Sequence, residues 1–173
     1  SSDVCSSDLF DPLFAALYTA PMITFVPVLV VWFGVGMQSK AVITFLSAFI
    51  PIVINTRTGV SEVSESWIKA LRAYGANRWQ IVAKGLIPGA LPAIMAGVRL
   101  AIGRSIVSLI AAEMYVSVKG VGRLVQVYST SDRAAEIFVL VIVISSLGFI
   151  GVVLVRRIEA FVAPWSEIGR AHV

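Results

Sequence analysis

The chain has 173 residues, of which 58% are apolar, and it carries a formal net charge of +4 with one cysteine and one histidine. A mean hydropathy of +0.90 excludes an ordinary soluble globular protein. Two long stretches, Pro12–Ser39 and Ile137–Val155, contain no charged residue at all. Because a helix needs about 20 predominantly apolar residues to cross the hydrocarbon core, we expect an integral membrane protein.

The two ends of the chain differ from the sequence between them. Residues 1–9 (SSDVCSSDL) can be encoded by a DNA string whose reverse complement encodes residues 167–173 (EIGRAHV) followed by a stop codon. The string resembles a common sequencing adapter, so both ends are predicted to be adapter-derived and not native. Residues 10–166 are then a fragment of a longer protein. With Cys5 and His172 set aside, this fragment offers no thiol nucleophile, histidine base or Cys/His metal site.

Four membrane-spanning helices are predicted, at about 12–35, 40–58, 89–114 and 133–158. Unbroken apolar runs such as FVPVLVVWF and IFVLVIVI favour helices over the alternating strands of a membrane barrel. Basic residues gather between the second and third spans and after the last one, so the positive-inside rule places the 59–88 loop and both fragment ends in the cytoplasm. Topology thus accounts for the basic charge, and we expect no nucleic-acid partner. These basic residues are Arg57, Lys69, Arg72, Arg78, Lys84, Arg156 and Arg157.

The 59–88 loop has the pattern of two short helices. Ser64 can cap the first helix, and Gly75 stands where a left-handed terminus needs no Cβ. Asn77 can start the second helix, and Pro88 precedes the next span. The segment is either an interfacial helix resting on lipid headgroups or a docking element for a cytoplasmic partner. Helical spacing predicts one apolar face made by Trp67, Ala70, Leu71 and Tyr74, and another made by Trp79, Val82, Ala83 and Leu86.

Small residues recur at every fourth position of the third predicted span. They are Ala93, Gly97, Ala101 and Ser105. Small side chains at this spacing allow helices to approach closely in lipid. We therefore expect them to pack against another helix, and the alternative is that they line a pathway.

Three charged residues lie within the same span. Arg104 lies near the middle, where a charge is costly and faces protein or water. It either attracts an anionic substrate in a pathway or pairs with an acid elsewhere in the subunit. Arg99 is expected to extend toward the headgroups. Glu113, at the outer end, could reach Lys119 or Arg123.

The stretch KALRAYGANRWQIVAKGLIP resembles the EAA loop of the membrane subunits of ATP-driven (ABC-type) importers. Ala70, Gly75 and Pro88 match that pattern, whereas Lys69 replaces its acidic residue and Gly85 its isoleucine. Leu71 replaces its second alanine, and Ile87 conservatively replaces its leucine. Other stretches resemble, in the right order, the permeases for nitrate, taurine and aliphatic sulfonates. They are VPVLVVWFGVGMQSK, PIVINT, IPGALPAIMAGVRLAIGR and AAEM followed by GVGRL.

The resemblance implies an all-α, polytopic membrane protein with the type I ABC importer transmembrane fold. The fragment would hold about four of six spans, and the N-terminal two would be missing. It would be a permease subunit of the bacterial inner membrane that forms the pathway for a small anionic nutrient, such as an aliphatic sulfonate, taurine or nitrate. The residues implied for ATPase coupling are Trp67, Ala70, Leu71, Tyr74, Gly75 and Pro88, and those for the pathway are Arg104 and Glu113.

The implied partners are an ABC ATPase subunit, a second permease copy in a homodimer, and an extracytoplasmic substrate-binding protein. The chain itself is not expected to be an enzyme or to bind a cofactor or metal. ATP and Mg would lie on the ATPase, because the chain has no G-x-x-x-x-G-K-[ST] loop. One rival hypothesis is a secondary transporter without an ATPase. Polar or acidic residues near the middle of a span would favour it, whereas Arg104 is the only charge found there. Another is a membrane enzyme, which the lack of His and Cys in the fragment disfavours.

Overall fold

The computed structural model describes residues 22–117 and 119–162, and within these ranges the chain forms helices and no strands. The predicted all-α class is therefore confirmed. The ends predicted to be adapter-derived, residues 1–9 and 167–173, lie outside the described residues. So does the first part of the first predicted span, residues 12–21.

Nine helical elements follow one another along the described chain. They are η1 (Met22–Phe25), α2 (Val26–Phe33), α3 (Met37–Ser61), α4 (Glu65–Ala73), α5 (Arg78–Ile81), the π-helical turn η2 (Val82–Leu86), α6 (Ile87–Val116), α7 (Val121–Thr130) and α8 (Ala134–Val162).

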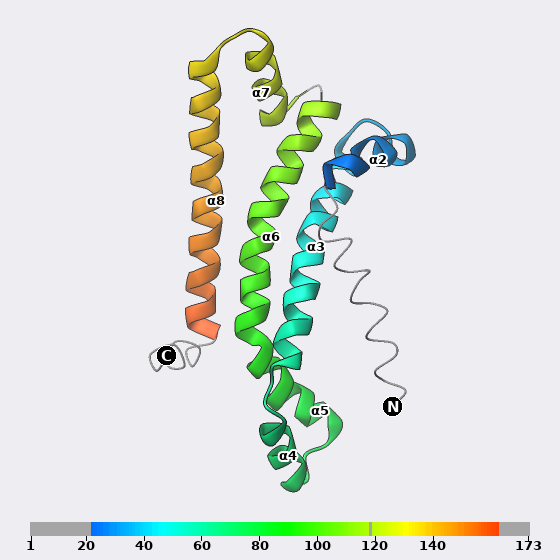
Figure 1. Cartoon of the computed structure of the whole chain (residues 1–173), viewed down its shortest axis with the longest axis vertical. Coiled ribbons are helices and arrows are strands. Elements are labelled where there is room, and N and C mark those ends of the chain that lie inside the picture. Colours follow the sequence, from blue (N-terminus) through cyan, green and yellow to red (C-terminus); the bar gives the residue numbers. More distant parts are fainter. Residues whose placement is uncertain (1–21, 118, 163–173) are drawn as a thin grey trace.

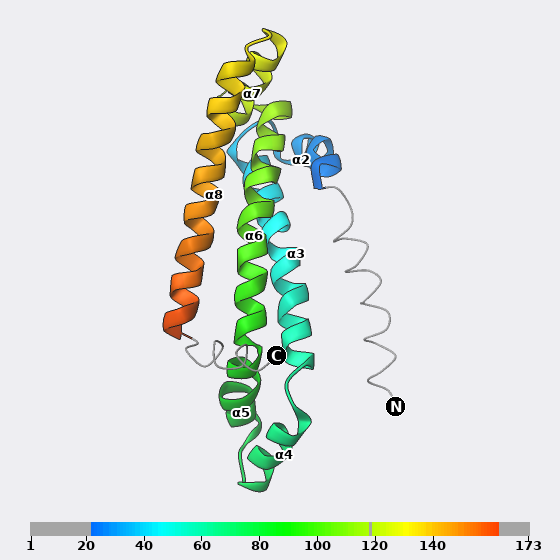
Figure 2. The same cartoon turned by 60° about the vertical axis from the view of Figure 1, so that its left-hand side comes forward.

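Three long helices lie side by side and form the body of the molecule (Figures 1 and 2). They are α3, α6 and α8, and in the described chain they are the helices long and apolar enough to cross a membrane. They overlap the predicted spans 40–58, 89–114 and 133–158, and each extends beyond its prediction. The described part of the first predicted span is a shorter apolar helix, Met22–Phe33, which lies at the α7 end of the bundle.

Helices α3 and α6 make the closest pair, because glycines remove side chains from their contact. A Cβ on Gly97 of α6 would lie 2.9 Å from Asn55 Cβ and 3.1 Å from the Pro51 carbonyl oxygen of α3. Gly59 of α3 faces α6 in the same way, since a Cβ there would lie 2.5 Å from Ala93 Cβ. The backbones thus approach as small-residue contacts in membranes allow.

The other small residues of α6 are placed less uniformly. Ala101 is buried, whereas Ser105 is half-buried and its hydroxyl donates to the Ala101 carbonyl within the helix, at 2.6 Å. The polar link to α3 comes from Ser108, whose hydroxyl accepts a hydrogen bond from buried Ser47 at 2.7 Å. Periodicity pointed to Ser105 and missed Ser108, which lies three residues further along the helix.

Helix α8 contacts α6 along one narrow face. Gly148 and Gly151 lie against Ile106 and Ile102 of α6, respectively. None of the most apolar window of α8 is buried inside the described chain. In a membrane protein, its outward apolar side chains meet lipid or another polypeptide.

An ion pair joins the same two helices. Arg99 of α6 pairs with Glu159 of α8, whose side chain is 8% exposed. The expectation that Arg99 would extend toward the headgroups is therefore wrong. Because the carboxylate is buried, removing either partner would leave an uncompensated charge between the two helices.

An apolar cluster closes the α7 end of the bundle. Val26 and Leu29 of α2 pack against Ile43 of α3 and Ala112 of α6, and all four are buried. This cluster holds α2 against the two long helices.

Replacing Gly97 with leucine should separate α3 from α6, because the new side chain would meet backbone atoms of Pro51 and Ile52. Overpacking of this kind costs about 1–3 kcal/mol. We expect a lower midpoint of thermal unfolding in detergent for Gly97→Leu. Gly103→Leu is the matched control, because a Cβ at Gly103 has open space around it. Equal midpoints for the two variants would contradict the packing described above.

Candidate functional site

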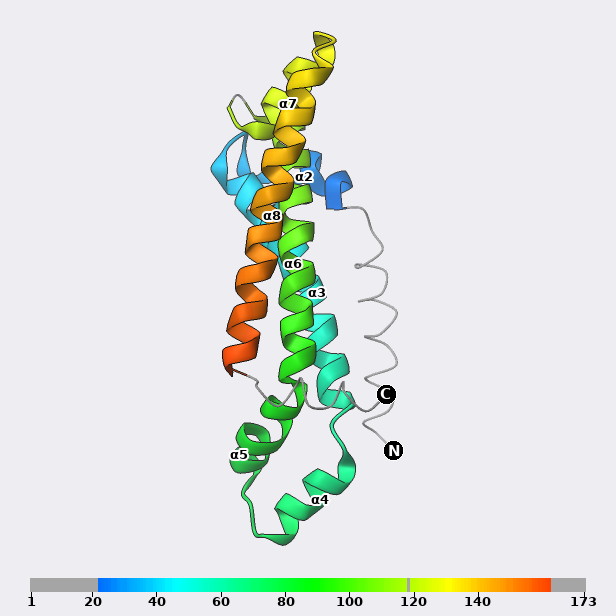
Figure 3. The same ribbon diagram turned by 90° about the vertical axis from the view of Figure 1, so that its left-hand side faces the viewer.

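The two short helices α4 and α5 extend beyond the ends of the long helices, at the end of the molecule opposite α7 (Figures 1 and 3). We call residues 64–88 the α4–α5 segment. Helix α5 and the π turn η2 run into α6 without a break, so that Arg78–Val116 is one continuous helical stretch of 39 residues. One end of the segment is thus rigidly connected to the centre of the bundle.

The π turn arises where proline interrupts the normal helical ladder. Pro88 has no N–H and its ring crowds the carbonyl four residues earlier. The preceding N–H, that of Ile87, reaches back five residues to the Val82 carbonyl, which is the π-helical bond. Pro88 itself is the second residue of α6, and the π turn before it accommodates the proline within the continuous stretch.

Helix α4 begins as predicted at Ser64, but the cap is different. The Ser64 side chain makes no capping bond to the helix. Its hydroxyl instead shares a 2.5 Å hydrogen bond with that of Ser66. Glu65 in the first turn pairs with Lys69 at 2.8 Å, one turn later. The acidic charge near the helix N-terminus stabilises this end in place of a cap.

Gly75 ends α4 in the left-handed conformation, with φ of +77°. The Ala76 N–H donates to the Leu71 carbonyl at 3.0 Å and the Gly75 N–H to the Arg72 carbonyl at 2.9 Å. These two hydrogen bonds form a Schellman motif, in which glycine avoids the strain that a Cβ would bring. The chain therefore turns sharply between the two helices.

Asn77 starts α5 through a capping box. Its side-chain oxygen accepts from the Arg78 N–H at 2.6 Å, and its own N–H donates to the Gln80 side chain at 2.9 Å. Local side chains therefore determine where both short helices meet, as the sequence indicated.

The predicted apolar face of α4 packs against the chain only in part. Leu71 and Ile68 close over Gly85 of the π turn, where a Cβ would lie 2.8 Å from Leu71 and 3.2 Å from Ile68. Ala70 is exposed and Tyr74 is 92% exposed. The missing side chain of Gly85 therefore determines where α4 rests, and it leaves much of the predicted apolar face on the surface.

The second predicted face lies mostly on the surface. Ile81 and Gly85 are the inward residues of α5 and η2, whereas Trp79 is 80% exposed and Val82 and Ala83 are exposed. Of the residues predicted on this face, Leu86 alone is half-buried. Trp67 is 55% exposed. The surface of the segment thus carries three large aromatic side chains, those of Trp67, Tyr74 and Trp79.

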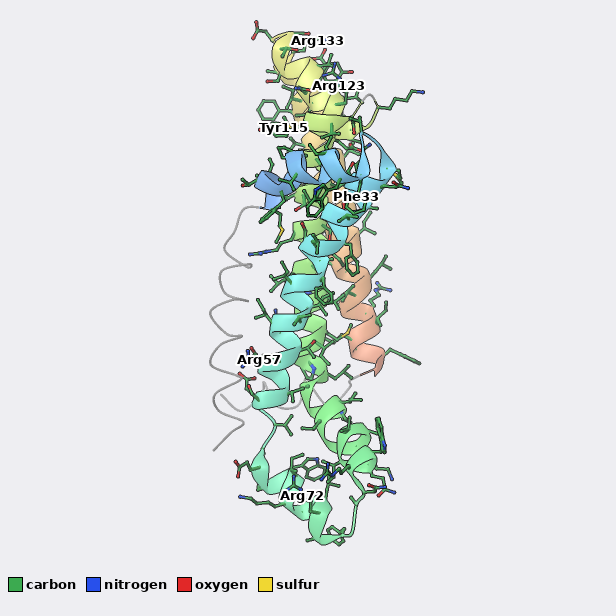
Figure 4. The ribbon with its side chains drawn as sticks, turned by 90° about the vertical axis from the view of Figure 1, so that its right-hand side faces the viewer. Phe33, Arg57, Arg72, Tyr115, Arg123 and Arg133 are labelled. Carbon is green, nitrogen blue, oxygen red and sulfur yellow. The ribbon has the colours of Figure 1, made fainter. Side chains whose placement is uncertain are left out.

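The opposite end of the molecule carries Glu113, which joins three elements. Its carboxylate lies 3.6 Å from the Lys40 ammonium of α3 and accepts the N–H of Gly122, at the start of α7, at 2.9 Å. The predicted contact of Glu113 with Arg123 is wrong, because Arg123 donates to Gln126 at 2.6 Å. The contacts found for Glu113 in the described chain do not include Lys119 either. Figure 4 shows Arg123 at the end of the molecule opposite Arg72.

Glycines make the approach of α7 to α6 possible. A Cβ on Gly120, whose φ is +137°, would overlap the Glu113 carboxylate, and one on Gly122 would overlap the Ile110 carbonyl. Arg104 lies between the two ends, half-buried on α6. The structure thus places Arg104 and Glu113 on one helix, nine positions apart, and does not bring them together with the α4–α5 segment.

Comparison with known proteins gives one family. The model of the binding-protein-dependent transport system inner membrane component matches residues 5–165. The taurine transport system permease protein of Escherichia coli strain K12 is 31% identical over 159 residues, which are 91% of this chain and 57% of that protein.

Two other relatives have similar coverage. The formylaminopyrimidine transport permease protein of Halalkalibacterium halodurans is 27% identical over 90% of this chain and 62% of its own length. The putative aliphatic sulfonates transport permease protein of Bacillus subtilis strain 168 is 30% identical over 90% of this chain and 56% of its own length. The chain therefore spans little more than half of the relatives that it matches.

Replacing Glu113 with alanine should release the start of α7, because both the Gly122 N–H and the Lys40 ammonium lose their acceptor. Leaving such buried groups unpaired costs about 1–3 kcal/mol. We expect faster hydrogen exchange at the Gly122 amide. Glu136→Ala is the control, since Glu136 makes an exposed pair with Arg133 in the first turn of α8. Unchanged exchange at Gly122 in the Glu113 variant would show that the carboxylate does not hold α7.

Proposed function

Because the chain belongs to the family of binding-protein-dependent transport system inner membrane components, we propose that it is a pathway-forming permease subunit of an ATP-driven importer. In this proposal the α4–α5 segment couples the chain to a cytoplasmic ATPase subunit. The whole assembly would contain two permease copies, two ATPase subunits and an extracytoplasmic binding protein. ATP and Mg would bind to the ATPase subunits.

One observation supports the coupling role above the others. The segment carries exposed Trp67, Tyr74 and Trp79, yet its backbone is fixed by a Schellman motif, a capping box and the contact of α4 with Gly85. Exposed aromatic side chains on a rigid element are typical anchors of protein interfaces. A coupling element must also move as one body with its partner.

The continuous helix from Arg78 to Val116 supplies the route for that movement. A displacement of α5 by a partner would be carried through η2 into α6, which contacts α3, α7 and α8. The membrane part of the chain would therefore respond without a separate hinge between the segment and the bundle.

The orientation of the chain follows from charge. The α4–α5 segment holds Lys69, Arg72, Arg78 and Lys84 against the single acid Glu65. By the positive-inside rule this end lies in the cytoplasm, and the α7 end with Glu113 lies outside. The binding protein would then dock at the α7 end.

We propose a small anion, such as a sulfonate or nitrate, as the substrate. Arg104 is half-buried at the middle of α6, where a cation in a membrane helix faces protein or water. Its charge would favour anions in the pathway. A secondary transporter remains the rival hypothesis, and it differs in needing no ATPase.

Gly75→Val tests the coupling. A β-branched residue at φ +77° is strained by about 1–2 kcal/mol, so the turn between α4 and α5 should change. We expect the full-length permease to lose most of the ATPase that co-purifies with it, while still inserting into the membrane. Gly75→Asn is the control, because asparagine tolerates this conformation. If the wild-type protein retains no ATPase at all, the importer hypothesis is wrong and the secondary transporter is favoured.

Arg104→Ala tests the substrate class. In proteoliposomes with the ATPase and the binding protein, uptake of methanesulfonate or nitrate should fall at least about ten-fold, which corresponds to 1.4 kcal/mol. Arg104→Lys keeps the charge and should retain part of the uptake. ATPase association should not change in either variant. A parallel loss of uptake and assembly would leave Arg104 with a structural role alone.

A further inference from the structure

An open cleft lies between α4 and α5 on the surface of the α4–α5 segment. It has a volume of about 570 Å³ and is lined by Arg72, Arg78, Ile81 and Val82. Arg72 comes from the last turn of α4 and Arg78 from the first residue of α5. The Gly75 turn therefore brings two cations from different helices to one site, which we call the Arg72–Arg78 cleft.

An arginine side chain carries a planar, positively charged guanidinium group with five N–H donors. Among the described residues, neither Arg72 nor Arg78 forms an ion pair with a carboxylate. The nearest acid in the sequence, Glu65, is engaged by Lys69 at 2.8 Å. The cleft thus presents a double positive charge that the chain itself does not neutralise.

The rest of the cleft is apolar. Ile81 is 9% exposed and Val82 is 37% exposed. A site with an apolar wall and two guanidinium groups matches a carboxylate carried on a short aliphatic stem, because planar guanidinium groups bind carboxylates with two parallel hydrogen bonds. Exposed Trp79, next to Arg78 in the sequence, adds the kind of side chain that protein interfaces favour.

We propose that the Arg72–Arg78 cleft accepts an aspartate or glutamate side chain of the ATPase subunit. This inference rests on the proposed function and specifies the chemistry of the partner at that site. A protein is favoured over a lipid headgroup because the segment extends beyond the end of α8, away from the lipid-facing lengths of the long helices (Figures 1 and 3). Charge complementarity then sets the register in which the ATPase meets α4 and α5.

The test uses the full-length permease in nanodiscs of phosphatidylcholine, which is neutral overall, and the ATPase encoded beside its gene. The dissociation constant is measured at 50 and 200 mM salt. Arg72→Gln with Arg78→Gln should weaken binding about ten-fold at low salt and flatten its salt dependence, since rim charges act on both. Lys84→Gln is the matched control. It is combined with Lys69→Gln, so that the control also removes two positive charges from the segment, and neither lysine lines the cleft.

A second variant distinguishes the loss of charge from a loss of folded structure. Arg72→Lys with Arg78→Lys keeps both charges and should keep the salt dependence, with a smaller loss of affinity because lysine cannot bind a carboxylate bidentately. Wild-type affinity and salt dependence in the glutamine variant would overturn the cleft proposal and leave the importer function standing.

Two further outcomes would also overturn the cleft proposal. The first is that the glutamine variant alters only the binding of phosphatidylglycerol added to the nanodiscs, which would assign the cleft to a lipid headgroup. The second is that the wild-type permease fails to bind the ATPase, which would overturn the cleft and the proposed function together.

Discussion

The close approach of α3 and α6 is the contact on which the other elements depend. In lipid there is little hydrophobic gain from bringing two apolar helices together, so association relies on close packing and on polar contacts between helices. Gly59 and Gly97 provide the packing, and the Ser47–Ser108 hydrogen bond provides the polar contact. Helix α6 also contacts α7 and α8. Its first turn continues directly from the α4–α5 segment. A bulky residue at the α3–α6 contact would therefore affect both ends of the molecule.

Local chemistry made part of this structure predictable. The long apolar runs gave the positions of α3, α6 and α8, because length and hydropathy alone specify a membrane helix. Gly75 and Asn77 gave the turn between α4 and α5, because a left-handed terminus and a capping box are determined by a few neighbouring residues. Ala93 and Gly97 were predicted to allow close packing, and the structure places both against α3.

Contacts between distant parts of the chain could not be predicted in the same way. Glu113 pairs with Lys40, and Arg99 pairs with Glu159, each about sixty or more positions away. Sequence reasoning looked for partners in the nearest loop or at the headgroups, since nothing in one sequence indicates which helices are neighbours. The contact of α4 with the rest of the chain is of the same kind. It depends on Gly85, a residue of another element, whose missing side chain lets Ile68 and Leu71 approach.

The π turn before Pro88 has a geometric consequence for the direction of the whole α4–α5 segment. A π-helical turn holds one more residue than an α-helical turn, and each residue of an α-helix rotates the chain by about 100° about the axis. If η2 became a regular α-helical turn with all of its residues kept, the extra residue would rotate α5, with α4 attached, roughly a quarter of a turn around the axis of α6. Apolar and basic groups that now share one side would then point elsewhere, although every residue on α4 and α5 would be unchanged. The angular phase of a single helix thus determines which side of the molecule presents the α4–α5 segment to a partner.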